Sequence, residues 1–517
     1  MGQYYGVSWK YRLTLPDMIS EEVVYIHPSK HAASFKDYAK AGSASPYMLI
    51  PVGVSGMMNM LREDGFRVRG INLPLEIFLD QQFVLESWLK SQHGVRLFAI
   101  DLHWYEHSFG ALDVASACKQ IYPEVPVVLG GLTASLFAKE ILEHFPQIDF
   151  IILGDGEIAL RSLARHLSRC EGENLAEVPN LMYRQNRQVV STGVTYCAAQ
   201  TDLDSLNFVD MDFMLHADQH AELIYSLSEK VEMADSVGGK GHWLTIGRGC
   251  LYNCSFCGGG NAAHMLIAKR KGIIPRSPKR VVDDLERLRT AGIQQVSLNL
   301  DPAIMGRDYW HELFAEMRLP QVKIGFYIEF FQLPEDEFIQ ELLLSADIPH
   351  SELAFSPLSG SERVRRMNGK IFPNSQLANI LEQLRHSDMA VFIYFSLNLP
   401  GEDIKSFRQT LRLADEIGHR YPPQRLRMIN MVHTIDPCSP MSRQPRKYNQ
   451  RVQFQTFMDY YTYCQETPVL RKDRELGAWR GYYSLGQPSQ ALENMAAEWN
   501  RFCAHQRSRC YPVPRTW

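Results

Sequence analysis

The sequence predicts an α/β protein in which a doubly wound domain is followed by a partial (β/α)6 barrel and a helical C-terminal cap. Two observations predict the sheets: short β-branched runs alternate with helical stretches across residues 20–170, and again across residues 241–440. Strands that alternate with helices at this spacing form βαβ units, which build parallel sheets. The third observation is a set of aromatic residues at helical spacing in residues 441–517, which predicts packed helices.

The first predicted domain contains five strands joined by helices. The strands are expected at residues 23–26, 67–71, 96–100, 125–129 and 149–153. The helices are expected at residues 54–63, 79–91, 111–121 and 136–144. Asp64 and Gly65 form a helix stop after the first of these helices. Five such units suit a flavodoxin-like fold, whose ligands bind beyond the carboxyl ends of the strands.

Glycines and polar side chains follow these strands, at the edge where a ligand would bind. They are His27, Asp101, His103, Gly130, Gly131, Thr133, Ser135, Gly154, Asp155 and Glu157. Glycine at such positions lets a bulky cofactor approach the backbone closely. The alternative is a Rossmann-like domain that holds a nucleotide or nothing, because doubly wound folds serve many functions.

Residues 171–240 are expected to link the two sheets. A small hairpin is predicted across residues 178–190. Residues 203–214, which lie among four aspartates, are predicted to be an extended strap.

The second alternation predicts a partial barrel of six strands. They are expected at residues 243–247, 295–300, 322–330, 353–356, 391–398 and 426–433. One of the intervening helices is expected at residues 280–291, where Ser277 and Pro278 are a typical helix start. The loop after the first strand then lies at the functional end of the barrel.

That loop carries three cysteines, Cys250, Cys254 and Cys257, just before a run of three glycines. Three thiolates on one tight loop can hold three corners of a 4Fe–4S cluster and leave the fourth iron open to a small molecule. A zinc site would want a fourth ligand nearby, and His264 lies seven residues beyond Cys257, outside the usual spacing. Inert buried cysteines are rarely clustered in this way.

Composition describes an ordinary globular protein. The chain has 517 residues, of which 45% are hydrophobic and 22% charged, and it has a net charge of −4. This charge offers no basic field for nucleic acid. No signal peptide and no apolar run of membrane-spanning length is recognised, so we expect no membrane association. Ten cysteines, scattered apart from the central three, favour the reducing cytoplasm.

The cysteine spacing, with Phe256 before the third cysteine, resembles that of the radical S-adenosylmethionine (SAM) enzymes. The Gly-Gly-x-Thr-x-Ser run that starts at Gly130 and the Gly-Asp-x-Glu run at Gly154 resemble the cobalamin-binding domain that precedes the barrel in one subclass. The resemblance covers roughly residues 20–440. It implies a 4Fe–4S cluster, SAM and cobalamin as cofactors. Residues 436–440 resemble the Pro-Gly-Ser turn of the family, with Cys438 in place of the glycine.

The resemblance also suggests contacts to SAM. Many members have Gly-Gly-Glu after the second barrel strand, where this chain has Asn299 and Asp301 as substitutes. Ser356, after the fourth strand, and Arg363 are placed to reach the ribose and carboxylate, unless they belong to an ordinary helix cap.

One histidine pattern departs from the family. Asp101 and His103 look like the start of the Asp-x-His-x-x-Gly signature that supplies a histidine to cobalt, but the next glycine, Gly110, is seven residues after the histidine. We therefore expect no ligation of the family kind, with His103 or His107 lying under the corrin or simply hydrogen-bonded.

The function implied is a cobalamin-dependent radical SAM methyltransferase that acts on an unactivated carbon or phosphorus of a small molecule. An external electron donor such as flavodoxin or ferredoxin is implied too. Two alternatives remain: a non-methylating relative that forms or rearranges rings, and a sensor that binds the cofactors without turnover. The aromatic C-terminal residues are expected to be core or a cap over the barrel. No pattern in the sequence names the substrate.

Overall fold

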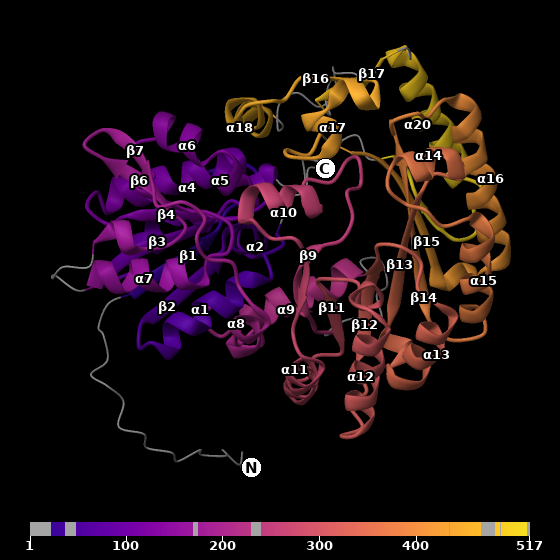
Figure 1. The fold of residues 1–517 in the computed structure, drawn as a ribbon, viewed down its shortest axis with the longest axis horizontal. Helices are drawn as coiled ribbons and strands as arrows, with labels where there is room; N and C mark the ends of the chain where they lie inside the picture. The colour runs from indigo at the N-terminus through magenta and orange to yellow at the C-terminus, as the bar shows by residue number, and fades with distance from the viewer. Residues whose placement is uncertain are drawn as a thin grey trace.

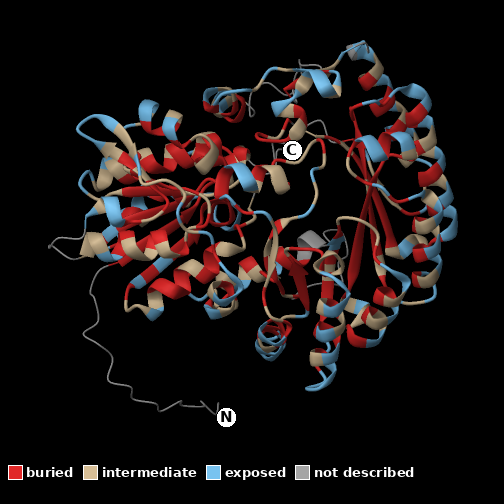
Figure 2. Ribbon diagram, viewed as in Figure 1, coloured by how far each residue is buried: buried red, intermediate tan, exposed pale blue. Residues whose placement is uncertain are grey.

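The computed structural model describes residues 22–36, 48–168, 174–228, 239–433, 435–466, 481–485 and 488–513. Two α/β lobes lie side by side, each built on a seven-stranded sheet (Figure 1). Buried residues are concentrated on the strands and on the helix faces turned toward them (Figure 2). The α/β class with parallel sheets is therefore confirmed.

The first sheet has the order β2-β1-β3-β4-β5-β6-β7. Its strands are β1 (Glu22–His27), β2 (Arg67–Asn72), β3 (Val95–Asp101), β4 (Val127–Gly130), β5 (Phe150–Ile152), β6 (Leu181–Gln185) and β7 (Gln188–Ser191). The first five are the predicted strands, and they run parallel in the flavodoxin-like order. The predicted hairpin is β6 and β7, which pairs antiparallel with β5 and so extends this sheet past residue 170.

Helices cover both faces of this sheet. They are α1 (Gly53–Glu63), α2 (Leu73–Leu79), α3 (Leu85–Lys90), α4 (Ser108–Ile121), α5 (Leu132–Leu136), α6 (Ala138–His144) and α7 (Glu157–Ser168), with short 3-10 turns η1 (Tyr105–His107) and η2 (Leu175–Glu177). The prediction of one helix over residues 79–91 was wrong. The Asn72 side chain accepts a hydrogen bond from Leu75 N and Pro74 follows, so a helix begins directly after β2, and it ends where Asp80 turns extended.

The connector contains α8 (Gln200–Ser205) and α9 (Ala217–Ser228), so the predicted strap begins as a helix. Its extended part contacts both lobes. Phe208 is fully buried beside Gly56 of α1, and the Arg276 guanidinium of the second lobe lies 4.8 Å from its ring centroid. Asp210 pairs with Arg287, and Asp212 pairs with Arg62 of α1. The connector therefore joins the two domains through a continuous core.

The second sheet has the order β18-β15-β14-β13-β12-β11-β8, with parallel neighbours. Its strands are β8 (Gly241–Leu244), β11 (Gln295–Leu298), β12 (Gly325–Phe330), β13 (Glu352–Leu358), β14 (Ala390–Leu397), β15 (Leu426–Val432) and β18 (Arg509–Tyr511). The first six are the predicted barrel strands. The seventh comes from the C-terminal region and was not predicted.

Helices of the second lobe cover the outer face of the curved sheet (Figure 1). They are α11 (Pro278–Thr290), α12 (Arg307–Arg318), α13 (Asp336–Ser345), α14 (Glu362–Met367), α15 (Asn374–Leu384) and α16 (Ile404–Arg420), with short turns η3 (Pro302–Met305), η4 (Ile348–His350) and η5 (Pro423–Arg425). Helix α10 (Asn261–Ala268) lies apart from them, between the two lobes. A two-stranded ribbon, β9 (Gly247–Cys250) with β10 (Gly272–Pro275), stands between the lobes.

The C-terminal region connects the lobes above this ribbon. It contains α17 (Pro440–Arg443), η6 (Pro445–Tyr448), β16 (Gln450–Val452), α18 (Phe457–Glu466), β17 (Tyr482–Ser484) and α20 (Ser489–Cys503). On α18, Tyr460 packs on Tyr105 of the first domain with ring centroids 5.2 Å apart and donates a hydrogen bond to Ile435 O. Trp499 of α20 is fully buried against Phe395 of β14. Tyr460 and Trp499 therefore belong to the packed core, which was one of the two roles expected for the C-terminal aromatic residues.

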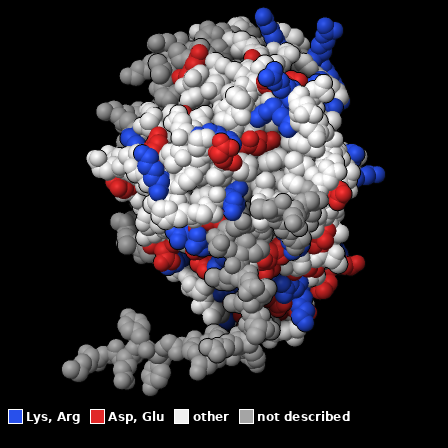
Figure 3. Space-filling view, turned by 90° about the vertical axis from the view of Figure 1, so that its left-hand side faces the viewer, with Lys and Arg blue, Asp and Glu red and all other residues white. Residues whose placement is uncertain are grey.

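Among the described helices, none combines the length and the apolar character needed to cross a bilayer. On the face of the first lobe shown in Figure 3, acidic and basic side chains are interspersed among uncharged ones.

Candidate active site

A cavity of about 750 Å³ lies between the two lobes, and the carboxyl ends of strands from both sheets line it. Ligand sites in both kinds of parallel sheet occur at this end of the strands. Thirteen of the sixteen predicted site residues line it: His103, Gly130, Gly131, Thr133, Gly154, Asp155, Glu157, Cys250, Cys254, Phe256, Cys257, Asn299 and Ser356. The other three, Ser135, Asp301 and Arg363, are not among its lining residues.

The cysteine loop begins on the ribbon. Cys250 ends β9, while Cys254 and Cys257 lie in the turn that leads to α10. Gly249 has φ +103°, and a Cβ there would lie 2.1 Å from Gly272 O, so glycine is needed for the close approach of the two ribbon strands. The cysteines therefore lie at the end of β9 and in the connection from β9 to β10, after the first barrel strand has ended at Leu244.

The three thiols suit an iron–sulfur cluster better than a single metal ion. All three are partly buried and line the one cavity. Three thiolates without a fourth protein ligand are the donor set of a cluster with one open iron. Backbone N–H groups of Tyr252 and Gly259 point at the Cys250 and Cys257 sulfurs, at 3.4 and 3.3 Å.

Aromatic and polar side chains of the barrel lie beside the cysteine loop. Phe256 stacks on His433, with ring centroids 4.6 Å apart and an interplanar angle of 8°. His433 contacts Ser396 Oγ through Nε2 at 2.8 Å. Gly369 approaches Cys254 so closely that a Cβ would lie 2.9 Å from its Cα, which brings Lys370 to the cavity wall. A flat ring and a cation beside the thiols can accept a planar, anionic ligand.

The residues proposed to contact SAM are placed differently from one another. Asn299 and Ser356 line the cavity; Asn299 also accepts from Ile246 N and donates to Gly247 O, while Ser356 donates to Glu329 at 3.0 Å. Asp301 is fully buried, and its carboxylate accepts from Ala303 N and Phe331 N, each at 2.9 Å. Burial raises the pKa of Asp301 to about 7. Its position is that of a loop-stabilising residue.

Arg363 lies off the cavity for a simple reason. It is exposed on α14 and donates to Gly401 O at 2.9 Å. Arg363 is not among the residues that line the cavity with the cysteine loop, so its position does not support the predicted contact with SAM.

The glycine run of the first domain forms one wall of the cavity. Gly131 has φ +115°, and a Cβ there would lie 2.6 Å from the His103 Cα, so two loops meet at this glycine. A Cβ on Gly130 would meet nothing within 4 Å. Thr133 donates to His103 O at 3.0 Å, and Ser135 donates to Gly131 O at 2.7 Å and accepts from Gly154 N. Ser135 therefore holds the loops at Gly131 and Gly154 together without lining the cavity, and Gly130 faces open space.

The acidic pair of the first domain contacts the second. Arg248, two residues before Cys250, pairs with Asp155 at 3.0 Å and with Glu157 at 2.6 Å. Arg270 also pairs with Asp155. Burial raises the pKa of Asp155, but Arg248 and Arg270 outweigh it and hold that pKa below its ordinary value. Residues predicted to touch a cofactor thus also bind the ribbon to the first domain.

The two histidines considered near the corrin are separated by the structure. His103 lines the cavity, and burial lowers its pKa to about 4, so it is neutral near pH 7. His107 is fully buried, lies off the cavity and sits 3.8 Å from Asp101. His264 of α10, absent from the predicted residues, lines the cavity, and its pKa is lowered to about 4, mainly by burial.

Other cavity residues were missed for identifiable reasons. Tyr394 and Ser396 both line the cavity, and two polar side chains near the carboxyl end of a predicted barrel strand are a signal that could have found them. Arg248 and Lys370 carry no such local pattern. They reach the site only because the ribbon and the loop after α14 fold back onto it.

The turn after β15 keeps the shape that glycine would give it. Cys438, which replaces the glycine of the family turn, has φ +66°, in the left-handed region. Neighbouring Asp436 accepts a hydrogen bond from Gly258 N at 2.6 Å. This contact ties the turn to the glycines that follow the third cysteine.

Comparison with protein families gives two matches. Residues 40–164 match the B12 binding domain, and residues 244–414 match the radical SAM superfamily. Two curated relatives are similar over longer stretches. The anaerobic magnesium-protoporphyrin IX monomethyl ester cyclase of Cereibacter sphaeroides is 22% identical over 406 residues, 76% of this chain and 59% of that protein. The hopanoid C-3 methylase of Methylococcus capsulatus is 24% identical over 283 residues, 54% of this chain and 48% of that protein.

The chain thus spans about half the length of these relatives. Among solved structures, the radical SAM methyltransferase TsrM from Kitasatospora setae, with cobalamin and a [4Fe-4S] cluster bound, matches with TM-score 0.64 at 14% identity, over 95% of this chain and 91% of that one. The cobalamin-dependent radical SAM enzyme OxsB matches with TM-score 0.51 over 76% of this chain and 52% of that one. At this identity these matches show the fold. The order of the two matched domains, with the cysteine loop and the glycine wall on one cavity, places the chain among the cobalamin-dependent radical SAM enzymes, with a 4Fe–4S cluster, SAM and cobalamin as its cofactors.

Proposed function

We propose that the chain is a methyltransferase that transfers a methyl group from SAM, by way of cobalamin, to an unactivated carbon or phosphorus of a small molecule. The observation that carries the proposal is the single cavity shared by the three thiols and the Gly130 wall. For this transfer SAM would have to reach the cobalamin, and the methylated cobalamin would have to reach the substrate, so both cofactors need access to one cavity. The similarity to a hopanoid C-3 methylase supports this choice.

When bound, the cluster supplies one-electron chemistry and cobalamin carries the methyl group. The chain binds, orients and shields. Cys250, Cys254 and Cys257 hold the cluster, and Phe256 with His433 offers a flat surface beside it. Tyr482 of the C-terminal region donates to Asn398 O at 3.3 Å and so holds the segment that follows β14 in place.

A second candidate function is ring formation without methylation. The similarity to the magnesium-protoporphyrin ester cyclase, which spans 76% of this chain, favours it. In either case we propose that a flavodoxin- or ferredoxin-like protein donates the electron and that the enzyme works in a reducing compartment, where its thiols persist.

One experiment separates the candidates without knowledge of the substrate. Reduced protein, reconstituted with iron, sulfide and cobalamin, is incubated with SAM, and the products are measured by mass spectrometry. A methyltransferase makes S-adenosylhomocysteine, because its cobalamin is methylated by SAM, and also makes 5′-deoxyadenosine. A ring-forming enzyme makes only 5′-deoxyadenosine. If neither product forms above a no-protein control, the enzyme proposal is overturned in favour of a binding protein.

The glycine wall leads to a graded prediction. Gly130→Leu should place a side chain in the open space beside the cavity wall. We expect bound corrinoid to fall at least about tenfold, because the leucine would overlap the space that the corrinoid needs and close-packed surfaces tolerate little overlap. Gly130→Ala should have a much smaller effect. Iron content and the thermal unfolding midpoint of Gly130→Leu should stay at wild-type values, because its Cβ meets no protein atom within 4 Å. A Gly130→Leu protein with full corrinoid would place the cofactor elsewhere.

The cavity histidine gives a second prediction. We expect the cob(II)alamin form to show no axial nitrogen splitting in its electron paramagnetic resonance spectrum, since the family histidine signature is absent. His103→Ala should then leave the coupling pattern unchanged. Without a nitrogen donor from the chain, bound cobalamin would be reduced more readily, because ligands tune metal potentials strongly. A nitrogen triplet that vanishes in His103→Ala would identify His103 as a ligand.

A further inference from the structure

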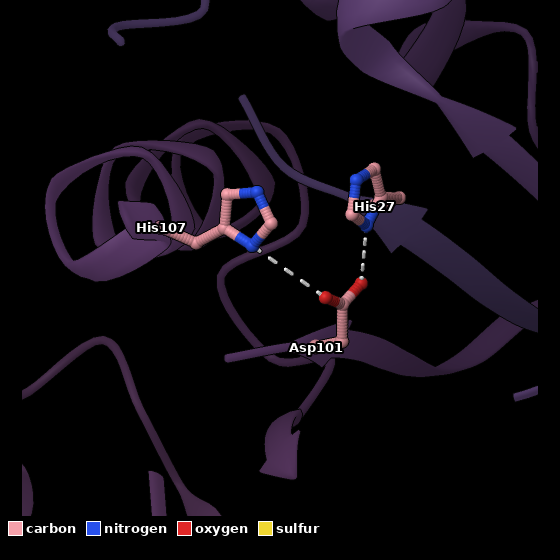
Figure 4. Close-up of side chains that lie close together, drawn as sticks. All are labelled: His27, Asp101 and His107. Carbon is pink, nitrogen blue, oxygen red and sulfur yellow. Dashed lines mark hydrogen bonds and ion pairs between the residues drawn. The ribbon is translucent and has the colours of Figure 1, made fainter. Parts of the chain in front are cut away.

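Two histidines and an aspartate meet at the carboxyl edge of the first sheet (Figure 4), and the aspartate, Asp101, also lines the cavity. His27 ends β1, Asp101 ends β3, and His107 lies in η1, just before α4. Nδ1 of His27 lies 2.9 Å from one carboxylate oxygen of Asp101. Nδ1 of His107 lies 3.8 Å from the other. The two imidazole rings are perpendicular, with centroids 4.8 Å apart.

The fold itself brings these three side chains together. In the strand order of this sheet, the chain leaves β1 and its neighbour β3 in opposite directions, so a crevice opens between their ends. The start of α4 closes that crevice. A Cβ on Gly110 would lie 1.8 Å from Ser29 O, so α4 packs directly on the loop after β1. His107 is thereby held beside His27 and Asp101 (Figure 4).

Burial makes the cluster unusual. His27 and His107 are both 0% exposed, and Asp101 is 6% exposed. Burying a carboxylate is costly unless opposite charge and hydrogen bonds compensate. Tyr25 donates to the Asp101 oxygen that faces His27, at 2.7 Å, whereas the oxygen that faces His107 accepts no hydrogen bond from the residues that the structure describes. The pKa of Asp101 is raised by burial but lowered further by His27 and His107, so the group remains a carboxylate.

We propose that His27, Asp101 and His107 bind a divalent transition-metal ion, with zinc as the best-suited metal. Their three donor atoms all lie within 4.8 Å of one another. Zinc binds imidazole nitrogen and carboxylate oxygen at about 2.0–2.2 Å, so two ligands 3.8 Å apart can sit on either side of one ion. Magnesium and calcium prefer all-oxygen sites and suit two imidazoles poorly.

The bound ion would have a positioning role. It would join β1, β3 and the start of α4, and so fix the loop between Asp101 and His107. That loop presents His103 and Trp104 to the cavity wall, and the Trp104 ring centroid lies 6.1 Å from that of His107. The site is separate from the cysteine loop and does not depend on the proposed methyl transfer.

The test uses the full-length holoprotein, with cluster and cobalamin in place so that the cysteine loop is occupied. It is incubated with zinc chloride, passed over a desalting column with a weak chelator, and analysed for zinc, iron and cobalt. We expect about one zinc per chain, and X-ray absorption at the zinc edge should show nitrogen and oxygen neighbours near 2.0–2.1 Å with no sulfur near 2.3 Å.

Variants then assign the ligands. His107→Gln and Asp101→Asn should each weaken zinc binding at least about tenfold, since even outer partners of a metal site contribute that much. His103→Gln, a histidine on the same loop that points to the cavity, should retain wild-type zinc. Absence of zinc from the wild-type protein would overturn the proposal, as would zinc bound by sulfur, and both readings stand even if a variant fails to fold. Equal zinc in His107→Gln, Asp101→Asn and the wild type would also overturn it.

Discussion

Replacing Cys250, Cys254 and Cys257 together by alanine is expected to remove the iron–sulfur cluster and, with it, all cleavage of SAM. The three thiols are the ligands that the ribbon and the turn before α10 bring to the cavity. A cluster bound through three cysteines has no other attachment once they are lost. Reconstituted variant protein should fall from about four irons per chain to background, lose its charge-transfer absorbance, and form no 5′-deoxyadenosine above a protein-free control.

The matched control is Cys503→Ala. Cys503 is partly buried at the end of α20, outside the cavity wall. This variant should keep its iron, absorbance and SAM cleavage. A triple variant that still holds about four irons per chain would show that the cluster is bound elsewhere.

The fold was predictable where local sequence determines local structure. Strands buried on both faces appear as short β-branched runs, so the strands from β1 to β5 and six strands of the second sheet could be placed from the sequence. β18 could not, because Arg509–Tyr511 is a three-residue strand whose pairing with β15 depends on a partner far away in the sequence. The helix prediction over residues 79–91 was wrong because the cap at Asn72 lies outside the window that the periodicity covered.

The residues of the candidate site also fall into two groups: those in a local sequence pattern, and those that only folding brings together. The cysteines and the glycine wall carry local spacing patterns, so they were predicted by number. Asp155 and Glu157 were predicted by pattern alone, and only the folded chain reveals Arg248 beside them. The cluster at His27, Asp101 and His107 joins three separate segments, and the family signature around His103 drew attention to a different histidine.

The second large effect is expected at the domain interface, where Arg248→Met should destabilise the contact between the ribbon and the first domain. Arg248 pairs with Asp155 and Glu157, whose side chains are 5% and 3% exposed. Asp155 keeps Arg270, but no other ion pair of Glu157 is recorded among the described residues. Removing one partner of a buried ion pair costs about 3–5 kcal/mol, because it leaves an uncompensated buried charge. The urea midpoint of the first unfolding transition should therefore fall.

A double-mutant cycle with Glu157→Gln identifies the cause. If the buried pair causes the destabilisation, the double variant Arg248→Met/Glu157→Gln should lose less unfolding free energy than the two single variants lose together. The difference should be at least about 0.5 kcal/mol. Arg62→Met provides the control, because its pair with Asp212 is 35% and 69% exposed and should contribute less than about 1 kcal/mol. Additive single variants would show that the pair does not couple the domains.

The same contact predicts a dependence on pH. The pKa of Asp155 in the folded protein is below its ordinary value of 3.8, so its ionised form is favoured by folding. Its contribution to stability is therefore complete above pH 3.8 and is lost as the pH falls through the lower folded value. Arg248→Met weakens the attraction that lowers this pKa, so the variant should lose less stability than the wild type over that acid range. If the stabilities of the two proteins instead fall in parallel with pH, Arg248 does not lower the Asp155 pKa, and Arg270 is then the cause of the shift.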